Sequence, residues 1–280
     1  MAEEKSGASR GNELRPLVGL EEWLEMNKNP PSSYIEQILP SEPGEFMLVA
    51  GRTGIGKSIL VMHMAFCLAN GVPFFGFKCK KVRVGLLVME GGTENIRDRM
   101  NKIIPQYTST ANIGFNLRPP FLLERHTKDF METFEGYKVV ILDNLRQVTP
   151  GQYLEPKYAA TFLKIYQACL GRIGAVGIIT CHIKKPNPAS VIAPGDIYVM
   201  KGATEYVDAC TTGLVLERKR QGHDESGRKT VVDYKRLELH FAKARIATKD
   251  LQPLELYQNY EKCSFDLIKE KSYDMVLPRK

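Results

Sequence analysis

Residues 46–58 read FMLVAGRTGIGKS, and the architecture of the chain follows from this stretch. Residues 46–50 are all apolar, as expected for a strand that is buried on both faces. Residues 51–58 then fit the phosphate-binding pattern G-x-x-x-x-G-K-[ST] without deviation. Because residues 59–69 continue with the composition of a helix, the sequence predicts a strand, a glycine-rich turn and a helix, which together form a P-loop.

Each part of this motif has a physical task in binding a nucleotide. The glycines let the backbone bend so that its N–H groups point inward at a phosphate, and the helix N-terminus adds the positive end of its dipole. Lys57 can reach the β- and γ-phosphate oxygens, and the Ser58 hydroxyl can ligate Mg²⁺. We therefore expect ATP and Mg²⁺ as cofactors. The predicted nucleotide-binding residues of the loop are Gly51, Arg52, Thr53, Gly54, Ile55, Gly56, Lys57 and Ser58.

Two acidic residues follow apolar runs and can complete this site. Asp143 follows the run 139–142 and is the expected second acid, which holds Mg²⁺ through water. Glu90 ends the run 84–89, and at the carboxyl edge beside the P-loop strand it could polarise an attacking water. The alternative for Glu90 is a turn or cap that leads into the next helix.

The rest of the chain from residue 46 alternates short apolar runs with helical segments. The expected strands are 46–50, 82–89, 113–117, 139–142, 175–180 and 211–216. A parallel sheet that is covered on both faces requires such apolar strands with helical crossovers, so the pattern favours this architecture. After Leu216, polar β-prone segments divided by residues 222–227 predict an antiparallel hairpin at the edge of the sheet. The predicted fold class is α/β, with a mostly parallel central sheet flanked by helices.

The chain divides into three predicted parts. Residues 1–14 are polar and read as a disordered leader, and residues 15–33 form a short N-terminal helix and linker. Residues 34–280 form a single ATPase domain. The helix carries Leu17, Leu20, Trp23 and Leu24 at helical spacing, so it either packs on its own domain or docks on a neighbouring subunit.

The composition is that of an ordinary globular protein, with 43% hydrophobic and 25% charged residues. The N-terminus lacks the basic and apolar segments of a signal peptide, so we expect a cytoplasmic protein without membrane contact. A formal net charge of +7 permits nucleic-acid binding without requiring it. The six cysteines form no C-x-x-C pair, which argues against a disulfide framework or a zinc site.

Residues 71–77 (GVPFFGF), the basic segment after them and the strand ending in Glu90 resemble the RepA-like branch of hexameric replicative helicases in the RecA-like superfamily. The resemblance extends from about residue 34 to about residue 249. It also includes the P-loop, the Asp143 strand, a strand that ends in Cys181-His182, and residues 201–204 (KGAT). It implies a RecA-like P-loop core for the predicted α/β fold.

The resemblance also assigns roles to single residues. It implies that Glu90 is the catalytic base, that Arg99 packs on the adenine with Arg97 as the second choice, and that His182 senses the γ-phosphate and couples it to a DNA-binding loop. Cys181-His182 stands where the family usually has two histidines. A lone histidine after an apolar strand is more often structural, so that alternative stays open.

Lys243 and Arg245 lie two residues apart in the predicted hairpin. Residues i and i+2 of a strand share a face, so both cations can point at one anion. In RecA-like rings, such a pair completes the nucleotide site of the neighbouring subunit in the manner of an arginine finger. The alternative is solvated charge on the hairpin.

Residues 183–202 form a predicted loop that is rich in proline, glycine and small residues. At about 20 residues it is longer than usual connections within a domain. It carries Lys184, Lys185 and Lys201, and by the resemblance it corresponds to the loop that lines the DNA channel. Contacts from lysines to a DNA backbone would be independent of sequence and sensitive to salt. The loop of residues 146–158 could join it.

The leading prediction is therefore a homo-hexameric, ATP-driven single-stranded DNA translocase or helicase of replication. The second hypothesis is a recombinase or a KaiC-like regulatory ATPase. It is weaker because the sequence pattern predicts neither a separate N-terminal DNA-binding domain nor a tandem second ATPase domain. The third hypothesis is an adaptor protein that is switched by nucleotide binding and has no motor activity.

Overall fold

The computed structural model of the protein describes residues 17–26, 32–117, 121–149, 155–183, 193–199, 204–219 and 233–269. The chain separates into two compact units, residues 1–30 and residues 31–280. The predicted leader, residues 1–14, lies outside the described residues. In the smaller unit, helix α1 (Leu20–Met26) begins later than the predicted start at Leu17. Leu20, Trp23 and Leu24 of this unit are exposed, and both docking alternatives for the helix stay predictions.

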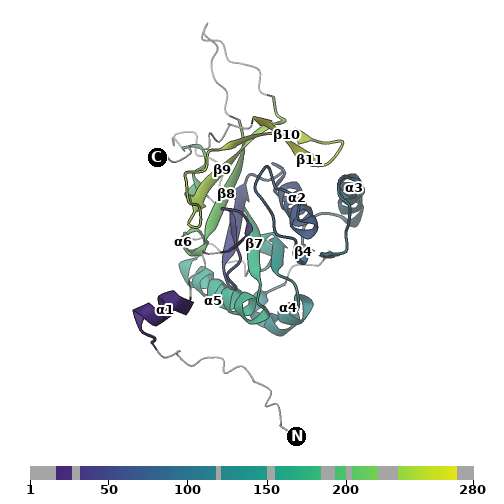
Figure 1. The fold of residues 1–280 in the computed structure, drawn as a ribbon. Coiled ribbons are helices and arrows are strands. Elements are labelled where there is room, and N and C mark those ends of the chain that lie inside the picture. The colour runs from purple at the N-terminus through teal and green to yellow at the C-terminus, as the bar shows by residue number, and fades with distance from the viewer. Residues whose placement is uncertain are drawn as a thin grey trace, which may run out of the picture. The chain divides into compact units, whose positions relative to one another are not determined.

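The larger unit is built on a nine-stranded sheet with the order β11-β10-β9-β8-β3-β7-β6-β4-β5 (Figure 1). Its strands are β3 (Phe46–Gly51), β4 (Val84–Val88), β5 (Ile113–Leu117), β6 (Val139–Asp143), β7 (Val176–His182), β8 (Thr212–Arg218), β9 (Arg236–Ala244), β10 (Leu254–Asn259) and β11 (Ser264–Lys269). Strands β8, β3, β7, β6, β4 and β5 run parallel, and β9, β10 and β11 extend the β8 edge in antiparallel order. A separate antiparallel pair joins β1 (Ser33–Ile35) to β2 (Leu39–Pro40).

This architecture confirms the predicted α/β class and the mostly parallel sheet with an antiparallel edge. The predicted place of the Glu90 strand beside the P-loop strand is wrong, because β4 lies between β6 and β5, and β7 and β6 separate it from β3. The predicted hairpin corresponds to β8 and β9, while β10 and β11 were not predicted. Their apolar residues alternate with polar ones over only a few positions, so their sequence carries a weak strand signal.

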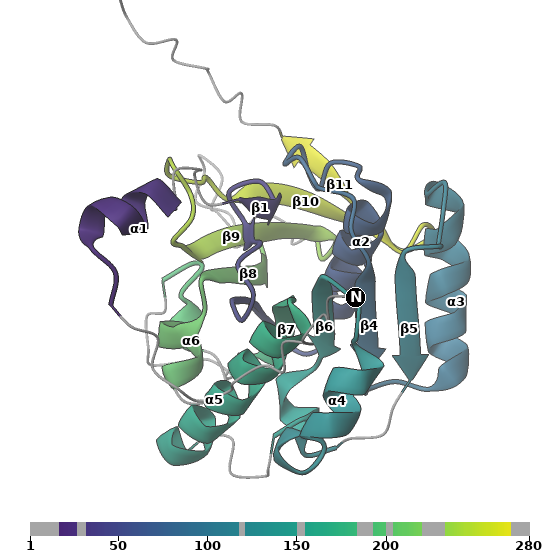
Figure 2. The ribbon, with the colours of Figure 1, turned by 60° about the horizontal axis from the view of Figure 1, so that its bottom comes forward.

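Helices cover both faces of the parallel strands (Figure 2). They are α2 (Lys57–Asn70), α3 (Thr93–Ile103), α4 (Thr127–Thr133), α5 (Pro156–Ile173) and α6 (Glu205–Ala209), with short 3₁₀ turns η1 (Ile104–Gln106), η2 (Leu123–Arg125), η3 (Leu145–Gln147) and η4 (Ile197–Val199). Successive side chains of β3 alternate between the two layers: Met47 and Val49 join the core with α2, and Leu48 and Ala50 join the core with α5. No helix in the described part of the chain is long and apolar enough to cross a membrane.

Helix α2 is buried on nearly all sides, which explains why its sequence is apolar all round. One side faces the sheet, and the other is covered by the β10–β11 hairpin, whose Leu256 and Phe265 share the core with α2. The hairpin therefore closes the hydrophobic core on the outer side of the P-loop helix.

His63 of α2 lies in an aromatic cluster, with its ring centroid 5.6 Å from Phe74, 5.2 Å from Phe75 and 6.1 Å from Tyr107. Its Nδ1 is hydrogen-bonded to the Tyr107 hydroxyl, which can donate to a neutral ring but not to a protonated one. Burial lowers the pKa of His63 to about 4. The ring is therefore neutral in the folded protein at pH 7.

We expect acidification to destabilise the fold through His63. The unfolded chain takes up a proton near the ordinary pKa of 6.5, whereas the folded chain resists protonation down to about pH 4. The stabilisation is complete above about pH 7 and falls by up to about 3 kcal/mol between pH 6.5 and pH 4. Urea unfolding at pH 7.5 and pH 4.5 measures this loss, and a His63→Gln variant should lose less stability over the same interval. An equal loss in both proteins would assign the effect to other groups.

Candidate active site

The site forms at the carboxyl edge of the parallel strands, where β3, β7, β6 and β4 all end. The sheet register places Gly51 beside His182 and Val88 beside Asp143, while β7 extends past the end of β6, so these strands end close together at one edge. A cavity of about 420 Å³ opens at this edge. It is lined by Thr53, Gly54, Gly56, Lys57, Ser58, Ile59, Glu90, Asp98, Arg99, Lys102, Asp143, Asn144, His182, Gln258, Tyr260 and Cys263.

The P-loop has the backbone shape that its glycines predict. Gly54 has φ +75° and Gly56 has φ +106°, in the left-handed region that side chains disfavour. A Cβ on Gly56 would also lie 2.8 Å from the Phe265 ring, so the β10–β11 hairpin leaves no space for one. Helix α2 begins at Lys57, directly after Gly56, so the N–H groups of its first turn and the positive end of its dipole lie at the cavity. This arrangement fits a bound phosphate.

Lys57 is held inside the loop and is only 6% exposed. Its ammonium donates to the carbonyl oxygens of Gly51 at 3.0 Å and Arg52 at 2.9 Å, and it lies 3.2 Å from Nδ1 of His182. Burial lowers the pKa of Lys57, and the negative charges of Asp143 and Glu90 offset part of that effect. An ammonium can only donate, so the His182 ring accepts at Nδ1 in this contact.

Asp143 and Ser58 supply oxygen donors to the same cavity. Asp143 is 4% exposed, and its carboxylate accepts a hydrogen bond from the buried Thr180 hydroxyl. A carboxylate and a hydroxyl are hard oxygen ligands of the kind that Mg²⁺ takes beside phosphates, so the donor set fits the predicted ion. Bound Mg²⁺ would neutralise charge on the phosphate oxygens.

Glu90 lies at the mouth of the cavity with its side chain 44% exposed. Gln147 donates to its Oε1 at 2.8 Å, and its Oε2 lies 3.9 Å from Nε2 of His182. Partial burial acts to raise the pKa of Glu90, but hydrogen bonds from Asn144 and Gln147 and the nearby His182 and Lys57 together hold that pKa below its usual value. The group is therefore a carboxylate at neutral pH, the form that a base needs.

The alternative role of Glu90 as a helix cap has no support in the geometry. Helix α3 begins at Thr93, its N-cap residue is Gly92, and no side chain makes the capping hydrogen bond. Glu90 is instead oriented by Gln147 of η3, which follows β6.

Several residues of the cavity were not predicted from the sequence. Asn144 follows Asp143, is 2% exposed, and its Nδ2 lies 3.5 Å from Nε2 of His182. Gln258, Tyr260 and Cys263 come from the β10–β11 hairpin. Because that hairpin is placed at the cavity by contacts that are distant in sequence, including its packing on α2, no local motif marks these residues.

The two candidate arginines of α3 differ in position. Arg99 lines the cavity and is partly buried, whereas Arg97 is exposed and does not line it. The geometry favours Arg99 over Arg97 for contact with a bound nucleotide.

Lys243 and Arg245 lie away from this cavity. Lys243 donates to the carbonyl oxygens of Val207 at 2.6 Å and Asp208 at 2.8 Å, and Arg245 donates to the same Asp208 oxygen at 2.7 Å. The two cations thus share one face and one acceptor at the C-terminal end of α6, where the helix dipole is negative. Neither one lines the nucleotide cavity of its own chain. The remaining candidates, Lys184, Lys185 and Lys201, lie outside the described residues.

Replacing Lys57 by Ala should abolish nucleotide binding to this cavity. The change removes a buried cation and leaves the carbonyl oxygens of Gly51 and Arg52 without their donor. Titration with a fluorescent ATP analogue measures the affinity. Lys128→Ala is the control, because Lys128 is exposed and paired with Glu132 on α4. Unchanged affinity in the Lys57→Ala variant would contradict the site.

Comparison with known families agrees with this geometry. The family model for an AAA domain matches residues 12–188, which is more than half of the chain. A comparison with curated proteins found no match. The matched stretch contains the P-loop, Glu90, Asp143 and His182, which all reach the described cavity. The chain therefore belongs to the AAA domain family and is a P-loop ATPase.

Proposed function

We propose that this protein is an ATP-driven motor that forms a ring, a hexamer by its resemblance, and translocates along or unwinds single-stranded DNA during replication. The observation that carries the proposal is the place of His182. It is the last residue of β7, lies 3.2 Å from the Lys57 ammonium and 3.9 Å from Glu90, and precedes the loop of residues 183–202 by one position.

His182 links the P-loop to Glu90 through its two ring nitrogens. Nδ1 lies near Lys57 and 3.3 Å from the Thr53 hydroxyl, while Nε2 lies near Glu90. A γ-phosphate on the P-loop would compete for the Lys57 ammonium and change the partners of Nδ1. Its loss after hydrolysis would reverse that change. Because the loop begins at the next residue, a shift of His182 would move the predicted DNA-contacting segment.

The cation pair supports assembly into a ring. Lys243 and Arg245 do not line the nucleotide cavity of their own chain, so any contact that they make with a nucleotide must be in a neighbouring chain. Burial lowers the pKa of Lys243, and Arg245 is exposed. Exchanging a neutral carbonyl acceptor for a phosphate would strengthen their hydrogen bonds.

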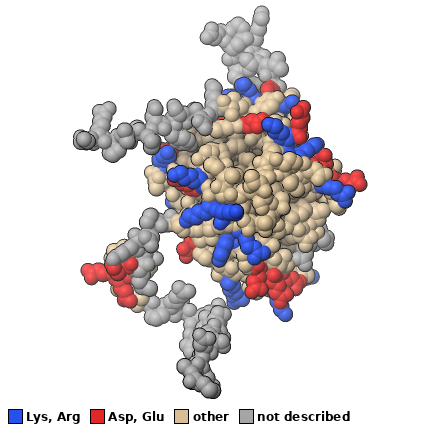
Figure 3. Space-filling model, turned by 45° about the vertical axis from the view of Figure 1, so that its right-hand side comes forward, with Lys and Arg blue, Asp and Glu red and all other residues tan. Residues whose placement is uncertain are grey.

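The charge distribution is compatible with a polyanionic partner. The formal net charge is +7, and Figure 3 shows Lys and Arg side chains in several groups on one face, with Asp and Glu side chains among them. A net positive charge favours contacts with a phosphate backbone.

Steady-state ATP hydrolysis with and without homopolymeric single-stranded DNA tests the proposal. A motor should be stimulated by single-stranded DNA, and the stimulation should fall steeply as salt is raised. Tight ATP binding with no turnover under either condition would support the adaptor hypothesis. An ATP hydrolysis rate that single-stranded DNA does not change, even at low salt, would reject DNA as the partner.

Changing Glu90 to Gln should leave ATP bound but slow hydrolysis by about 10²- to 10⁴-fold, because the amide keeps the shape but cannot accept a proton. Single-turnover hydrolysis and a separate binding titration distinguish the two effects. Glu94→Gln is the matched control, since Glu94 lies in the first turn of α3 and does not line the cavity. Loss of binding in the Glu90→Gln variant would make Glu90 a structural residue.

Mixing two inactive chains should restore part of the activity if the cations act in trans. An Arg245→Ala chain keeps its own Glu90, and a Glu90→Gln chain can offer its Arg245 across the interface. In rings assembled at random from equal amounts, about a quarter of the interfaces would pair the two intact residues. Recovered ATPase activity measures these interfaces. No recovery, together with a monomeric mass in the presence of ATP and Mg²⁺, would reject the ring.

A further inference from the structure

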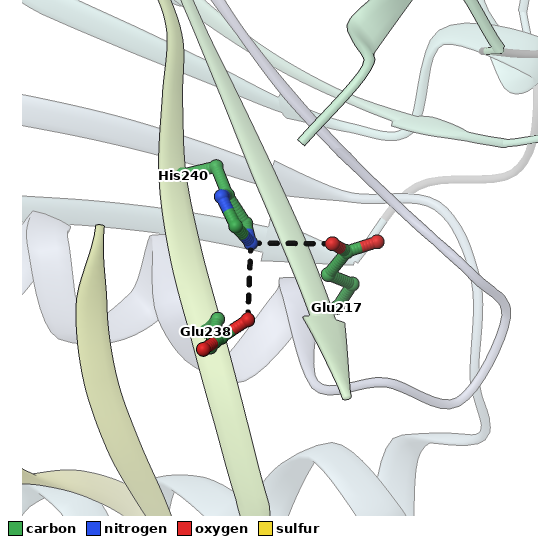
Figure 4. Close-up of side chains that lie close together, drawn as sticks. All are labelled: Glu217, Glu238 and His240. Atoms are coloured by element: carbon green, nitrogen blue, oxygen red, sulfur yellow. Dashed lines mark ion pairs between the residues drawn. The ribbon is translucent and has the colours of Figure 1, made fainter. Parts of the chain in front are cut away.

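A second cluster of polar side chains lies on β8 and β9, outside the nucleotide cavity (Figure 4). Glu217 of β8 is directly paired with Glu238 of β9 in the sheet register. His240 follows Glu238 by two positions, so its side chain lies on the same face. One donor atom from each residue falls within 4.8 Å of the others.

His240 is the buried centre of this cluster. The residue is 9% exposed, and its Nε2 atom has no hydrogen-bond partner in the described part of the chain. That atom nevertheless lies 3.2 Å from Oε1 of Glu217 and 3.5 Å from Oε2 of Glu238 (Figure 4). Nε2 is thus at ion-pair distance from two carboxylates without a hydrogen bond to either, and this needs a physical explanation because burying an unsatisfied polar atom costs about 1–3 kcal/mol.

These spacings are those of ligands around a tetrahedral metal ion. With metal–ligand distances of about 2.0–2.2 Å, neighbouring donors of such an ion are about 3.3–3.6 Å apart. The two measured separations from Nε2 are 3.2 Å and 3.5 Å. In a tetrahedral site each oxygen also lies roughly 35° away from the lone-pair direction of the ring nitrogen. This offset explains how the atoms can be close without forming a hydrogen bond.

We propose that Glu217, Glu238 and His240 bind a divalent transition-metal ion of the zinc class. One imidazole and two carboxylates suit such an ion, whereas Mg²⁺ prefers six oxygen ligands. The ion would lie between two carboxylates that the register places directly opposite each other on β8 and β9. A water would complete the tetrahedral set.

The position of the cluster indicates a structural task. The backbone N–H of Gly195 donates to Oε1 of Glu217 at 3.0 Å. Gly195 has φ +75°, and a Cβ there would lie 2.8 Å from Cβ of His240, so this backbone rests directly on the histidine. Metal binding would fix the orientation of Glu217 and His240, and through them the segment 193–198 on the sheet.

Titration of the full chain with CoCl₂ and ZnCl₂, without nucleotide or DNA, tests this site. We expect one equivalent of Co²⁺ to give the visible spectrum of a tetrahedral ion with nitrogen and oxygen ligands, and Zn²⁺ to displace it. Zn²⁺ should also raise the melting temperature. His240→Gln and Glu217→Gln should each weaken binding at least about tenfold, since loss of a ligand costs no less than loss of an outer-shell contact. Glutamine at position 217 can still accept from Gly195, so this variant separates metal binding from folding.

The matched control is His126→Gln. His126 is a partly exposed histidine, and among the described residues its one carboxylate partner is Asp129 at 3.1 Å, so the variant should bind Co²⁺ as the unchanged chain does. A band from thiolate-to-cobalt charge transfer would assign the metal to a cysteine and overturn the proposal. So would the absence of saturable binding, or binding that survives both His240→Gln and Glu217→Gln. None of these outcomes depends on the proposed motor function.

Discussion

The buried ammonium of Lys57 is the constraint on which the rest of the site depends. A cation that is 6% exposed must be compensated, and here it bonds to two carbonyl oxygens of its own loop and lies near His182. His182 is in place because β3 and β7 are parallel neighbours with Gly51 level with His182. The strand order of the sheet therefore sets the electrostatics of the cavity. A phosphate oxygen is a stronger acceptor than a carbonyl oxygen, so a bound phosphate can replace the carbonyl oxygens as the acceptor of the Lys57 hydrogen bonds.

The burial of α2 links the antiparallel edge of the sheet to this cavity. An apolar helix needs cover on its outer side, and β10 and β11 provide it. The same hairpin places Phe265 against Gly56 and brings Gln258 and Tyr260 to the cavity wall. Core packing and nucleotide contacts thus share one element, so a change that loosens the hairpin should alter both stability and affinity.

The sequence predicted the parts of the site that follow from strand ends. Glu90, Asp143 and His182 each terminate an apolar run, and parallel strands bring such termini to one edge. Asn144 and Gln147 could not be found in this way, because an amide after a strand carries no pattern of its own. Tyr260 escaped prediction because β10 and β11 are short and partly polar, and their position is set by contacts with α2 that are distant in sequence. The partners of Lys243 and Arg245 within the chain could likewise not be predicted from the sequence, because they are backbone carbonyl oxygens of another element.

Contacts through Tyr198 and Asp208 connect the predicted DNA loop to the Lys243–Arg245 pair at the predicted subunit interface. The Tyr198 hydroxyl donates to the Asp208 carboxylate at 3.1 Å. The backbone carbonyl oxygen of Asp208 accepts from Lys243 and Arg245. Tyr198 belongs to the segment that rests on His240, and His240 and Lys243 both lie on β9. If the cations leave Asp208 to reach a phosphate of a neighbouring chain, the end of α6 loses its compensating charge, and the segment held by Asp208 must respond. In the proposed ring, nucleotide binding in one chain would thus act on the DNA-contacting loop of the next, in addition to the path through His182 within each chain.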